Sequence, residues 1–419
     1  MIKINQSNVF GEVELSGAKN AALPIMVAAG LCKGKVVLKN MPTEINDVKV
    51  MVKLLEEAGM SVSVDNETKT IVIDKPENFV CNTNFSSEAS KIRYSLLLMP
   101  LGLSLSNTVS IPSPGGCNLG DRKYDIHIQT LEKLGAEVVD DGTVISCKKS
   151  DTLKGAELLF HIATTSGSEA AIIAGALAKG KTVVKNANTR PEVIDLVNFL
   201  NRMGAKIKYK TRYIEIEGVS ELHGGEYSIL SDRHEGMSYA ILAAMCRSEI
   251  RIKNFTEEFV REDVDLLREI GVDIFSWGGD LFVSAKNKEL KCFSMSTGAY
   301  PGINSDMQPL FAALALTIPG ETLITDTRFT GRFQYVSEFK KLGANIENYE
   351  NCVIIQGGGE LFGTDVVATD LRAGAALTFL GGVAKGTTQI SNYYQTERGY
   401  ENIVNKLKKI GYSIEKTAD

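Results

Sequence analysis

The chain has 419 residues, of which 44% are hydrophobic and 23% charged, and its formal net charge is −5 at pH 7. This composition is typical of a globular protein, and the length predicts two or more domains. A weakly acidic chain has no general attraction for nucleic acid or an anionic membrane, so an anionic ligand would need a local cluster of Arg and Lys. The sequence shows no apolar run long enough to span a bilayer and no secretory leader, so we expect a cytoplasmic protein without membrane insertion.

The seven cysteines are scattered and contain no Cys-x-x-Cys pair. This pattern argues against a disulfide framework and against a structural zinc site. No Walker A motif is present, which argues against a kinase or ATPase. The consecutive glycines at 278–279 and 357–359 have strand-like residues on both sides, so they predict hairpin turns and not a dinucleotide fingerprint.

A helix ending recurs six times along the chain, each time with a glycine that follows apolar or cationic residues. Successive glycines are 76, 69, 67, 72 and 68 positions apart, at Gly59, Gly135, Gly204, Gly271, Gly343 and Gly411. Glycine at the end of a helix supplies the left-handed residue that terminates it, and a strand-like segment follows each one. The sequence therefore predicts six copies of one structural unit.

Each unit begins with a helix of small apolar residues, as at 21–31, 170–177 and 373–383, and continues with an amphipathic helix, as at 192–202 and 335–342. A helix that is apolar nearly all round is buried, whereas an amphipathic helix covers a surface. We therefore expect an α/β fold of two lobes, each with three units. One lobe comprises residues 21–230, and the other comprises residues 1–20 and 231–419. The chain crossings near residues 20 and 230 would form a hinge, with the site between the lobes.

The stretch 111–125 surrounds one cysteine with turn-forming residues. Pro112 and Pro114 stiffen its start, and a helical pattern resumes only near residue 126. Cys117 is therefore expected at the tip of a loop, where Arg122 and Lys123 would favour its thiolate and lower its pKa. The alternative is an ordinary glycine-rich connection with an incidental cysteine.

Polar and charged residues gather where the buried helices are expected to start. A helix N-terminus offers free backbone N–H groups and a partial positive charge, so several of them together favour a substrate of phosphate type. The alternative for each start is a capped helix with a solvated charge. Asp306 could be a general base or only a helix cap. The candidate starts are 16–20, 90–93, 164–168, 232–235, 304–308 and 369–372, with Arg332 and Arg398 in connecting segments.

Four groups of residues carry a resemblance to a known family. They are Ser16-Gly-Ala-Lys-Asn-Ala-Ala-Leu-Pro24, Pro114-Gly-Gly-Cys117 with Gly120-x-Arg122, Pro301-Gly with Asp306-Met-Gln308, and Thr369-Asp-Leu-Arg372 followed by Arg398-Gly-Tyr400-Glu401. In this order, and over the full length, they resemble the EPSP synthase/enolpyruvyl transferase family. The resemblance implies a two-lobe inverse α/β barrel built from six βαβαββ-like units with buried parallel helices.

The resemblance also implies a reaction. The enolpyruvyl group of phosphoenolpyruvate would move to the 3′-hydroxyl of UDP-N-acetylglucosamine, with release of phosphate, as the committed step of peptidoglycan precursor synthesis. Such a reaction needs an acid for the methylene carbon, a base for the hydroxyl and cations that stabilise a tetrahedral ketal. Small-molecule substrates are the only partners implied, and no metal or organic cofactor is needed.

Residue roles follow from the same resemblance. Cys117 would protonate the methylene carbon and be alkylated by fosfomycin, and Asp306 would accept the proton of the attacking hydroxyl. The phosphate of phosphoenolpyruvate would be held by Lys19, Arg122 and Arg398. The resemblance places Arg332 and Arg372 toward the carboxylate of the donor. It also places Asp370 in the substrate site, in the same motif as Arg372. Contacts to the nucleotide or its sugar would come from Asn20, Arg93, Asp125, Thr165, Ser166 and Gly167.

Five positions differ from the usual family pattern, all on the acceptor side: Lys123, Tyr124, Thr189, Arg190 and Arg328. They leave two alternatives open. One is an enolpyruvyl transferase for another acceptor, such as UMP or a sugar phosphate. The other is a non-catalytic protein that binds nucleotide sugars.

Overall fold

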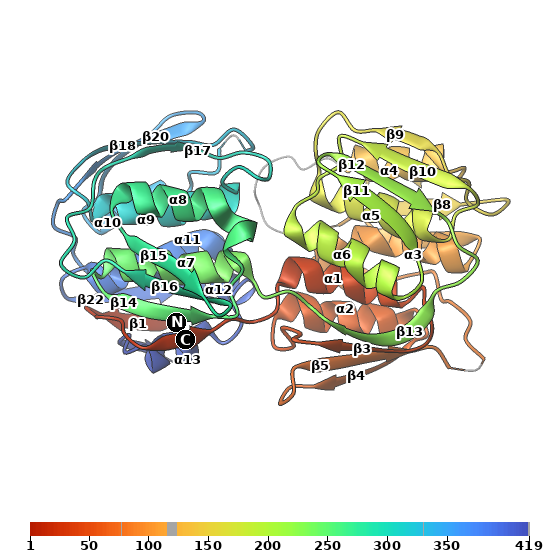
Figure 1. Ribbon diagram of the computed structural model, residues 1–419, viewed down its shortest axis with the longest axis horizontal. Helices are drawn as coiled ribbons and strands as arrows, with labels where there is room; N and C mark the ends of the chain where they lie inside the picture. Colours follow the sequence, from red (N-terminus) through yellow and green to blue (C-terminus); the bar gives the residue numbers. More distant parts are fainter. Residues whose placement is uncertain (77, 115–123, 330, 418–419) are drawn as a thin grey trace. The chain divides into compact units, whose positions relative to one another are not determined.

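A computed structural model describes residues 1–76, 78–114, 124–329 and 331–417 (Figure 1). The chain divides into two compact units. We call residues 1–16 and 231–417 the Asp306 unit, and residues 17–114 and 124–230 the Lys19 unit. Both chain termini belong to the Asp306 unit, where the Thr417 N–H donates to the Met1 carbonyl at 3.0 Å. None of the helices in these ranges is both long and apolar enough to cross a membrane.

The strands of the described residues form six small sheets, three in each unit. The Asp306 unit contains the sheets β21-β22-β1-β23, β15-β16-β14-β2 and β17-β18-β20-β19. Its strands are β1 (Ile2–Asn5), β2 (Glu12–Glu14), β14 (Glu249–Lys253), β15 (Asp273–Trp277), β16 (Asp280–Ser284), β17 (Ser294–Ser296), β18 (Gly320–Thr325), β19 (Asn345–Asn348), β20 (Cys352–Gly357), β21 (Asp365–Val367), β22 (Thr387–Ser391) and β23 (Ile414–Lys416).

The Lys19 unit contains the sheets β13-β3-β5-β4, β11-β12-β10-β9 and β6-β8-β7. Its strands are β3 (Lys33–Lys39), β4 (Ser61–Asp65), β5 (Thr70–Asp74), β6 (Thr108–Pro112), β7 (Glu137–Asp140), β8 (Val144–Lys148), β9 (Glu157–Leu159), β10 (Lys181–Lys185), β11 (Lys206–Lys210), β12 (Tyr213–Glu217) and β13 (His223–Ser228).

All six sheets follow one pattern. A central strand such as β10 pairs in parallel with β9 on one side and antiparallel with β12 on the other, and β11 then extends the sheet. In the β6 sheet, the parallel partner is reduced to a bridge between Asn84 and Ser110. The N-terminal strand β1 completes a sheet far along the sequence, because it lies between β22 and β23. The sequence repeat is therefore a structural repeat.

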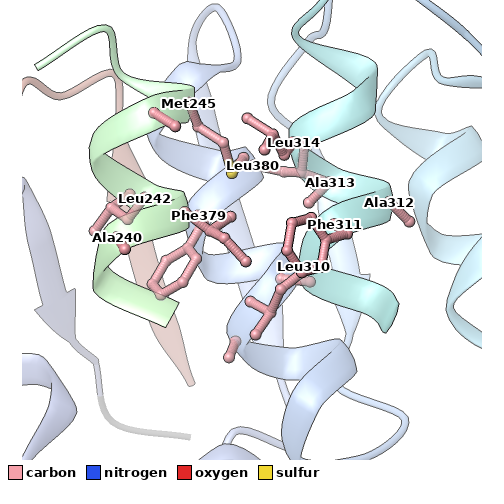
Figure 2. Close-up of a cluster of buried hydrophobic side chains, with 14 of the residues drawn as sticks. Ala240, Leu242, Met245, Leu310, Phe311, Ala312, Ala313, Leu314, Phe379 and Leu380 are labelled. Carbon is pink, nitrogen blue, oxygen red and sulfur yellow. The ribbon is translucent and has the colours of Figure 1, made fainter. Parts of the chain in front are cut away.

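The inner helix of each repeat is buried because apolar residues lie on all of its faces, with polar residues mainly toward its start. In the Asp306 unit, α7, α9 and α11 contact one another, and Figure 2 shows Leu242, Phe311 and Phe379 in the cluster of buried side chains that these helices contribute. Each of these side chains is fully buried, and such burial stabilises the fold by about 1.5–3 kcal/mol per side chain. The inner helices are α1 (Lys19–Ala29), α3 (Leu98–Leu105), α5 (Thr165–Ala176), α7 (Arg233–Met245), α9 (Gln308–Leu316) and α11 (Leu371–Val383).

The second helix of each repeat is more polar and ends at the glycine that the sequence singled out. All six glycines have φ between +86° and +112°, which confirms them as left-handed helix ends. These helices are α2 (Asn46–Glu57), α4 (Asp125–Lys133), α6 (Pro191–Arg202), α8 (Arg261–Ile270), α10 (Tyr335–Lys341) and α13 (Ile403–Lys409). The remaining helical segments are α12 (Tyr394–Glu397), η1 (Ser87–Lys91), η2 (Arg93–Leu97), η3 (Glu257–Val260) and η4 (Ser305–Met307).

Two expectations about local structure differ from the fold. The inner helices begin two to five residues before the predicted starts, at Lys19, Thr165 and Leu371, because their first turn carries polar residues that lack the apolar pattern. The predicted hairpin at 357–359 is wrong. Gly357 ends β20, and an added Cβ there would clash with the Ala315 carbonyl of α9, so this glycine permits a close approach of strand and helix.

An asparagine that ends the central strand forms a second repeat, which the sequence analysis missed. Asn40, Asn186 and Asn392 all have φ of +56° or +57°, a conformation that asparagine tolerates better than most residues. Their side-chain amides donate at 2.8–2.9 Å to the carbonyls of Ile229, Phe160 and Ala368, respectively. Each asparagine thereby ties the end of a central strand to the segment that follows its parallel partner.

Candidate active site

Asp306 lies in the short helix η4, immediately before the buried helix α9. Its backbone N–H donates to the Asn304 side chain at 2.9 Å, so Asn304 is the helix cap and the Asp306 carboxylate is available for other contacts. Arg332 Nη2 donates to Asp306 Oδ1 at 2.8 Å, and Arg372 Nε lies 3.5 Å from Oδ2. The structure therefore brings together three of the predicted site residues, from η4, a connecting segment and α11.

The two arginines are buried, with side chains only 2% and 3% exposed. Arg332 Nη1 donates to Ser305 Oγ at 2.9 Å, but its Nε has no hydrogen-bond acceptor among the described residues. The same holds for Nε and Nη1 of Arg372. Leaving buried donors unsatisfied is costly, and guanidinium groups match carboxylate and phosphate oxygens in geometry. This cluster is suited to an anion.

The charges of the cluster determine the ionisation of Asp306. Burial acts to raise the pKa of this carboxyl, but Arg332, Arg372 and His234 outweigh it and hold the pKa well below its usual range. Asp306 is therefore ionised at any physiological pH. Its carboxylate in turn helps to hold the pKa of both arginines above the usual value, against the effect of burial.

The start of α11 positions Arg372 and its neighbours. Asp370 caps the helix, because its carboxylate accepts hydrogen bonds from the N–H groups of Arg372 and Ala373 at 2.7 and 3.0 Å. An added Cβ on Gly399 would lie 2.5 Å from a methyl group of Leu371, so the segment with Arg398 packs closely on this helix start. Arg398 also donates to Gln395 at 3.3 Å. The predicted residues Asp370 and Arg398 thus belong to the same region of the Asp306 unit.

In the Lys19 unit, Lys19 opens helix α1 and forms an ion pair with Asp47 of α2, with 3.0 Å between Nζ and Oδ2. The two side chains are only 13% and 8% exposed. The sequence analysis missed Asp47, because an acidic residue in the first turn of an amphipathic helix is explained by the helix dipole alone. The pair fixes the ammonium group at the start of α1.

A proline in α1 leaves the backbone carbonyl of Asn20 available to a residue outside the helix. Pro24 has no N–H, so the carbonyl of Asn20 lacks its normal partner within α1. The hydroxyl of Tyr94 donates to this carbonyl at 3.4 Å, which draws η2 to the start of α1. Arg93 precedes Tyr94 in the same segment. Burial, together with the positive charge of Arg93, lowers the pKa of His127 to about 4.

The starts of α4 and α5 lie against each other. A Cβ on Gly167 would lie 2.8 Å from Ile126, so glycine is required for this contact. Asp125 is the neighbour of Ile126, and its carboxylate is 3.8 Å from His161 Nε2. On α5, Thr165 Oγ1 accepts a hydrogen bond from the Asn188 amide at 3.2 Å, and Ser166 follows in the same turn. Asn188 is a further missed residue, since a lone asparagine after a strand gives no signal of a distant partner.

Four of the five positions that differ from the family pattern are described, and the Thr189 hydroxyl accepts from the Arg212 N–H at 3.5 Å. Arg190 forms two hydrogen bonds to Glu192, of 2.6 and 3.1 Å. The Arg328 N–H donates to Asp326 at 2.9 Å, and the Tyr124 hydroxyl donates to Asp140 at 2.8 Å. Cys117, Arg122 and Lys123 lie outside the described residues, so their predicted roles stay predictions.

Comparison with known proteins gives a consistent result. A family model described as EPSP synthase (3-phosphoshikimate 1-carboxyvinyltransferase) matches residues 4–407. UDP-N-acetylglucosamine 1-carboxyvinyltransferase 2 of Clostridium tetani is 38% identical over 407 residues, which cover 96% of each chain. The UDP-N-acetylglucosamine 1-carboxyvinyltransferase of Finegoldia magna is 36% identical, with 99% of this chain and 98% of the relative covered.

Solved structures agree on the fold. The enolpyruvyl transferase NikO from Streptomyces tendae matches with a TM-score of 0.89 at 22% identity, covering 100% of this chain and 99% of its own. EPSP synthase from Acinetobacter baumannii matches with a TM-score of 0.75 at 17% identity, covering 99% of both chains. The predicted two-lobe α/β fold of the enolpyruvyl transferases is thereby confirmed, and the chain belongs to the EPSP synthase/enolpyruvyl transferase family.

Proposed function

We propose that the protein transfers the enolpyruvyl group of phosphoenolpyruvate to the 3′-hydroxyl of UDP-N-acetylglucosamine and releases phosphate. The observation that carries the chemistry is the carboxylate of Asp306 between the buried guanidinium groups of Arg332 and Arg372. The acceptor is inferred from full-length relatives that bear the name UDP-N-acetylglucosamine 1-carboxyvinyltransferase. The reaction would supply a precursor of peptidoglycan, and we expect it to take place in the cytoplasm.

The Asp306 cluster contains the groups that such an addition requires. The attacking hydroxyl must lose its proton as the carbon–oxygen bond forms, and Asp306 is the carboxylate proposed to accept it. The donor carries a carboxylate and a phosphate, and the unsatisfied donors of Arg332 and Arg372 are suited to the carboxylate. Fixed cations also stabilise the charge of the tetrahedral ketal without reorganisation during the reaction.

Binding of the donor would make Asp306 a better base. In the free protein, the two arginines hold its pKa well below the usual range, which makes it a weak proton acceptor. A donor carboxylate on the same arginines would offset their charge, and an anion near Asp306 raises the pKa of its carboxyl. Asp306 would thus become an effective base only when the donor is bound. This favours proton removal from the acceptor hydroxyl during transfer over proton removal in the absence of the donor.

The other roles are proposed with the same reaction. Cys117 would protonate the methylene carbon of the donor, and the phosphate would be held by Lys19, Arg122 and Arg398. Asn20, Arg93, Asp125, Thr165, Ser166 and Gly167 would contact the nucleotide or its sugar. The clustering of the starts of α1, α4, α5 and η2 in the Lys19 unit supports this assignment, because helix starts favour phosphate groups. Asp370 would act by capping α11.

The alternative acceptors and the non-catalytic alternative are not favoured by the names of the relatives. Arg190 is also weak evidence for a different acceptor, because its guanidinium is hydrogen-bonded to Glu192. An arginine that is paired with its neighbour adds no net charge for a more anionic acceptor.

The proposal is tested by product identification with wild-type protein and a Cys117→Ser variant. Wild-type protein incubated with both substrates should yield UDP-N-acetylglucosamine that carries an enolpyruvyl ether, as identified by mass spectrometry and NMR. Cys117→Ser should lose nearly all turnover and no longer be alkylated by fosfomycin, because a serine hydroxyl is a much weaker acid and nucleophile than a thiol. A wild-type product with UMP but not with the sugar nucleotide would contradict the acceptor, and full activity of Cys117→Ser would contradict the acid.

A further inference from the structure

Tyr400 lies between the candidate site and the core of the Asp306 unit, and the proposed reaction leaves it without a role. Its side chain is 1% exposed, in the segment between α12 and α13. The guanidinium carbon of Arg372 lies 4.9 Å from the centre of the Tyr400 ring, within the range of a cation–π contact. Tyr400 therefore supports the face of an arginine whose edge faces Asp306.

The hydroxyl of Tyr400 completes a directional hydrogen-bond chain. Ser238 on α7 donates its single hydroxyl proton to the His234 carbonyl at 2.6 Å. The 2.7 Å contact between Ser238 Oγ and the Tyr400 hydroxyl must then use the proton of Tyr400. The phenolic oxygen keeps its lone pairs, and the donated proton fixes the position of the ring. The hydroxyl thus fixes the ring that lies against the Arg372 guanidinium.

The residue after Tyr400 is fixed to a different part of the unit. Glu401 accepts a hydrogen bond from Ser16 Oγ at 3.0 Å, and Ser16 Oγ accepts one from Lys406 at 2.6 Å. Lys406 also pairs with Glu235 of α7 at 2.6 Å. Because Glu401 anchors the chain directly after Tyr400, the tyrosine has little freedom to follow a displaced arginine.

We propose that Tyr400 is a positioning residue that orients the Arg372 guanidinium for the carboxylate of the donor substrate. The inference rests on the proposed function, in which Arg372 binds that carboxylate. The contact of Asp306 with Arg372 Nε is long, at 3.5 Å, and Nε and Nη1 make no hydrogen bond with any described residue. The Tyr400 ring, packed against one face of the guanidinium, therefore constrains the plane in which its free edge lies. A well-oriented guanidinium binds a carboxylate through two parallel hydrogen bonds, so a small rotation weakens binding.

The test compares Tyr400→Phe with Tyr393→Phe. Both tyrosines are buried, at 1% and 4% exposure. The Tyr393 hydroxyl also contacts a hydroxyl on an inner helix, Thr378 Oγ1 at 3.3 Å, and Thr378 donates to the Gly374 carbonyl just as Ser238 donates to His234. Of these two tyrosines, it is Tyr400 whose ring lies against Arg372. Tyr393→Phe therefore controls for the loss of a buried phenolic hydroxyl.

Tyr400→Phe should raise the KM for phosphoenolpyruvate about tenfold, because the ring loses the hydrogen bond to Ser238 that fixes it against Arg372. Its kcat, its KM for UDP-N-acetylglucosamine and its thermal unfolding midpoint should resemble those of Tyr393→Phe. Equal KM values for phosphoenolpyruvate in the two variants, or an equal rise in the KM of both substrates, would overturn the inference.

Two further measurements cover the remaining cases. If Tyr400→Phe does not fold, Ser238→Ala removes the acceptor of the tyrosine proton and should still raise the KM for phosphoenolpyruvate selectively, and an unchanged KM would contradict the role of Tyr400. If wild-type protein shows no turnover with UDP-N-acetylglucosamine, the proposed function fails. Calorimetric binding of phosphoenolpyruvate then tests the inference separately. Weaker binding by Tyr400→Phe than by Tyr393→Phe supports it, and equal binding opposes it.

Discussion

Two carboxyl groups near the starts of inner helices, one in each unit, are shifted in opposite directions. In the Asp306 unit, Asp306 faces two buried arginines, which hold its pKa well below the usual range even though burial acts the other way. In the Lys19 unit, Glu169 of α5 is fully buried, and neither of its oxygens has a hydrogen-bond partner among the described residues. Burial raises the pKa of Glu169 to about 8, because Arg190 offsets it only in part and Glu192 adds to it.

The two pKa values shift in opposite directions because the two carboxyl groups have different charged neighbours. Asp306 itself contacts two guanidinium groups, whereas Glu169 and Glu192 both lie near the one guanidinium of Arg190, and Glu192 takes its two hydrogen bonds. A buried carboxyl in contact with two cations stays ionised, while a buried carboxyl whose nearby cation is already paired is relieved by protonation. Burial alone therefore does not identify a functional carboxyl, and the neighbouring charges decide which role it can take.

The largest effect is expected at Asp306. Asp306→Asn keeps the size of the side chain but removes the proton acceptor, so kcat should fall about 10³-fold, the range of general base catalysis. Binding of phosphoenolpyruvate should persist, because Arg332 and Arg372 remain. Phosphate release and calorimetric titration would measure the two quantities, with Asp365→Asn, an exposed aspartate of β21, as the control. Retained turnover would place the base elsewhere.

The second effect concerns stability and belongs to Glu169. Its pKa is raised in the folded protein, so its contribution to stability is complete below the unfolded pKa of 4.5 and is lost as pH rises through about 8. Glu169→Gln is neutral at every pH and escapes this loss. Relative to wild type, the variant should gain about 1.4 kcal/mol of unfolding free energy per pH unit, or about 3 kcal/mol between pH 5 and pH 7.

Urea unfolding at several pH values measures this difference. Glu217→Gln, at an exposed glutamate of the same unit, is the matched control and should show no comparable trend. A constant difference between Glu169→Gln and wild type across this pH range would mean that Glu169 is ionised in the folded protein, and the contrast with Asp306 would disappear.

The smallest effect is expected on acceptor binding. Thr165→Val removes the hydroxyl that accepts from Asn188 at the start of α5, and should raise the KM for UDP-N-acetylglucosamine about tenfold without changing that for phosphoenolpyruvate. Thr182→Val is the control, because the hydroxyl of this buried threonine in β10 has no hydrogen-bond partner among the described residues. Equal rises in both KM values would show that Thr165 acts on the fold and not on the acceptor.

The sequence was sufficient for the repeat and for the fold class, because both depend on local signals. Glycine at a helix end and an all-apolar inner helix are visible in a single segment, and all six glycines have the expected conformation. The helix starts were placed too late because residues such as Lys19 and Thr165 interrupt the apolar pattern. The asparagines that end the central strands were visible as well, but their meaning depends on a carbonyl far along the chain.

The site was predicted as a set of residues but not as a set of contacts. Nothing in the spacing of Asp306, Arg332 and Arg372 shows that one carboxylate lies between two guanidinium groups, or that Asp47 pairs with Lys19. Tyr400 was quoted in a motif, yet its role depends on Ser238, which lies 162 positions away. Such contacts arise from the packing of repeats on one another, and a single sequence contains no direct signal for them.

The most direct test of the proposed function is phosphate release from phosphoenolpyruvate by wild-type protein, measured with UDP-N-acetylglucosamine, with UMP and without an acceptor. We predict release only with the sugar nucleotide, since the donor gives up phosphate after the acceptor hydroxyl has added to it. Release with UMP alone would preserve the donor chemistry and contradict the acceptor. Absence of release under all three conditions would contradict the proposed transfer itself.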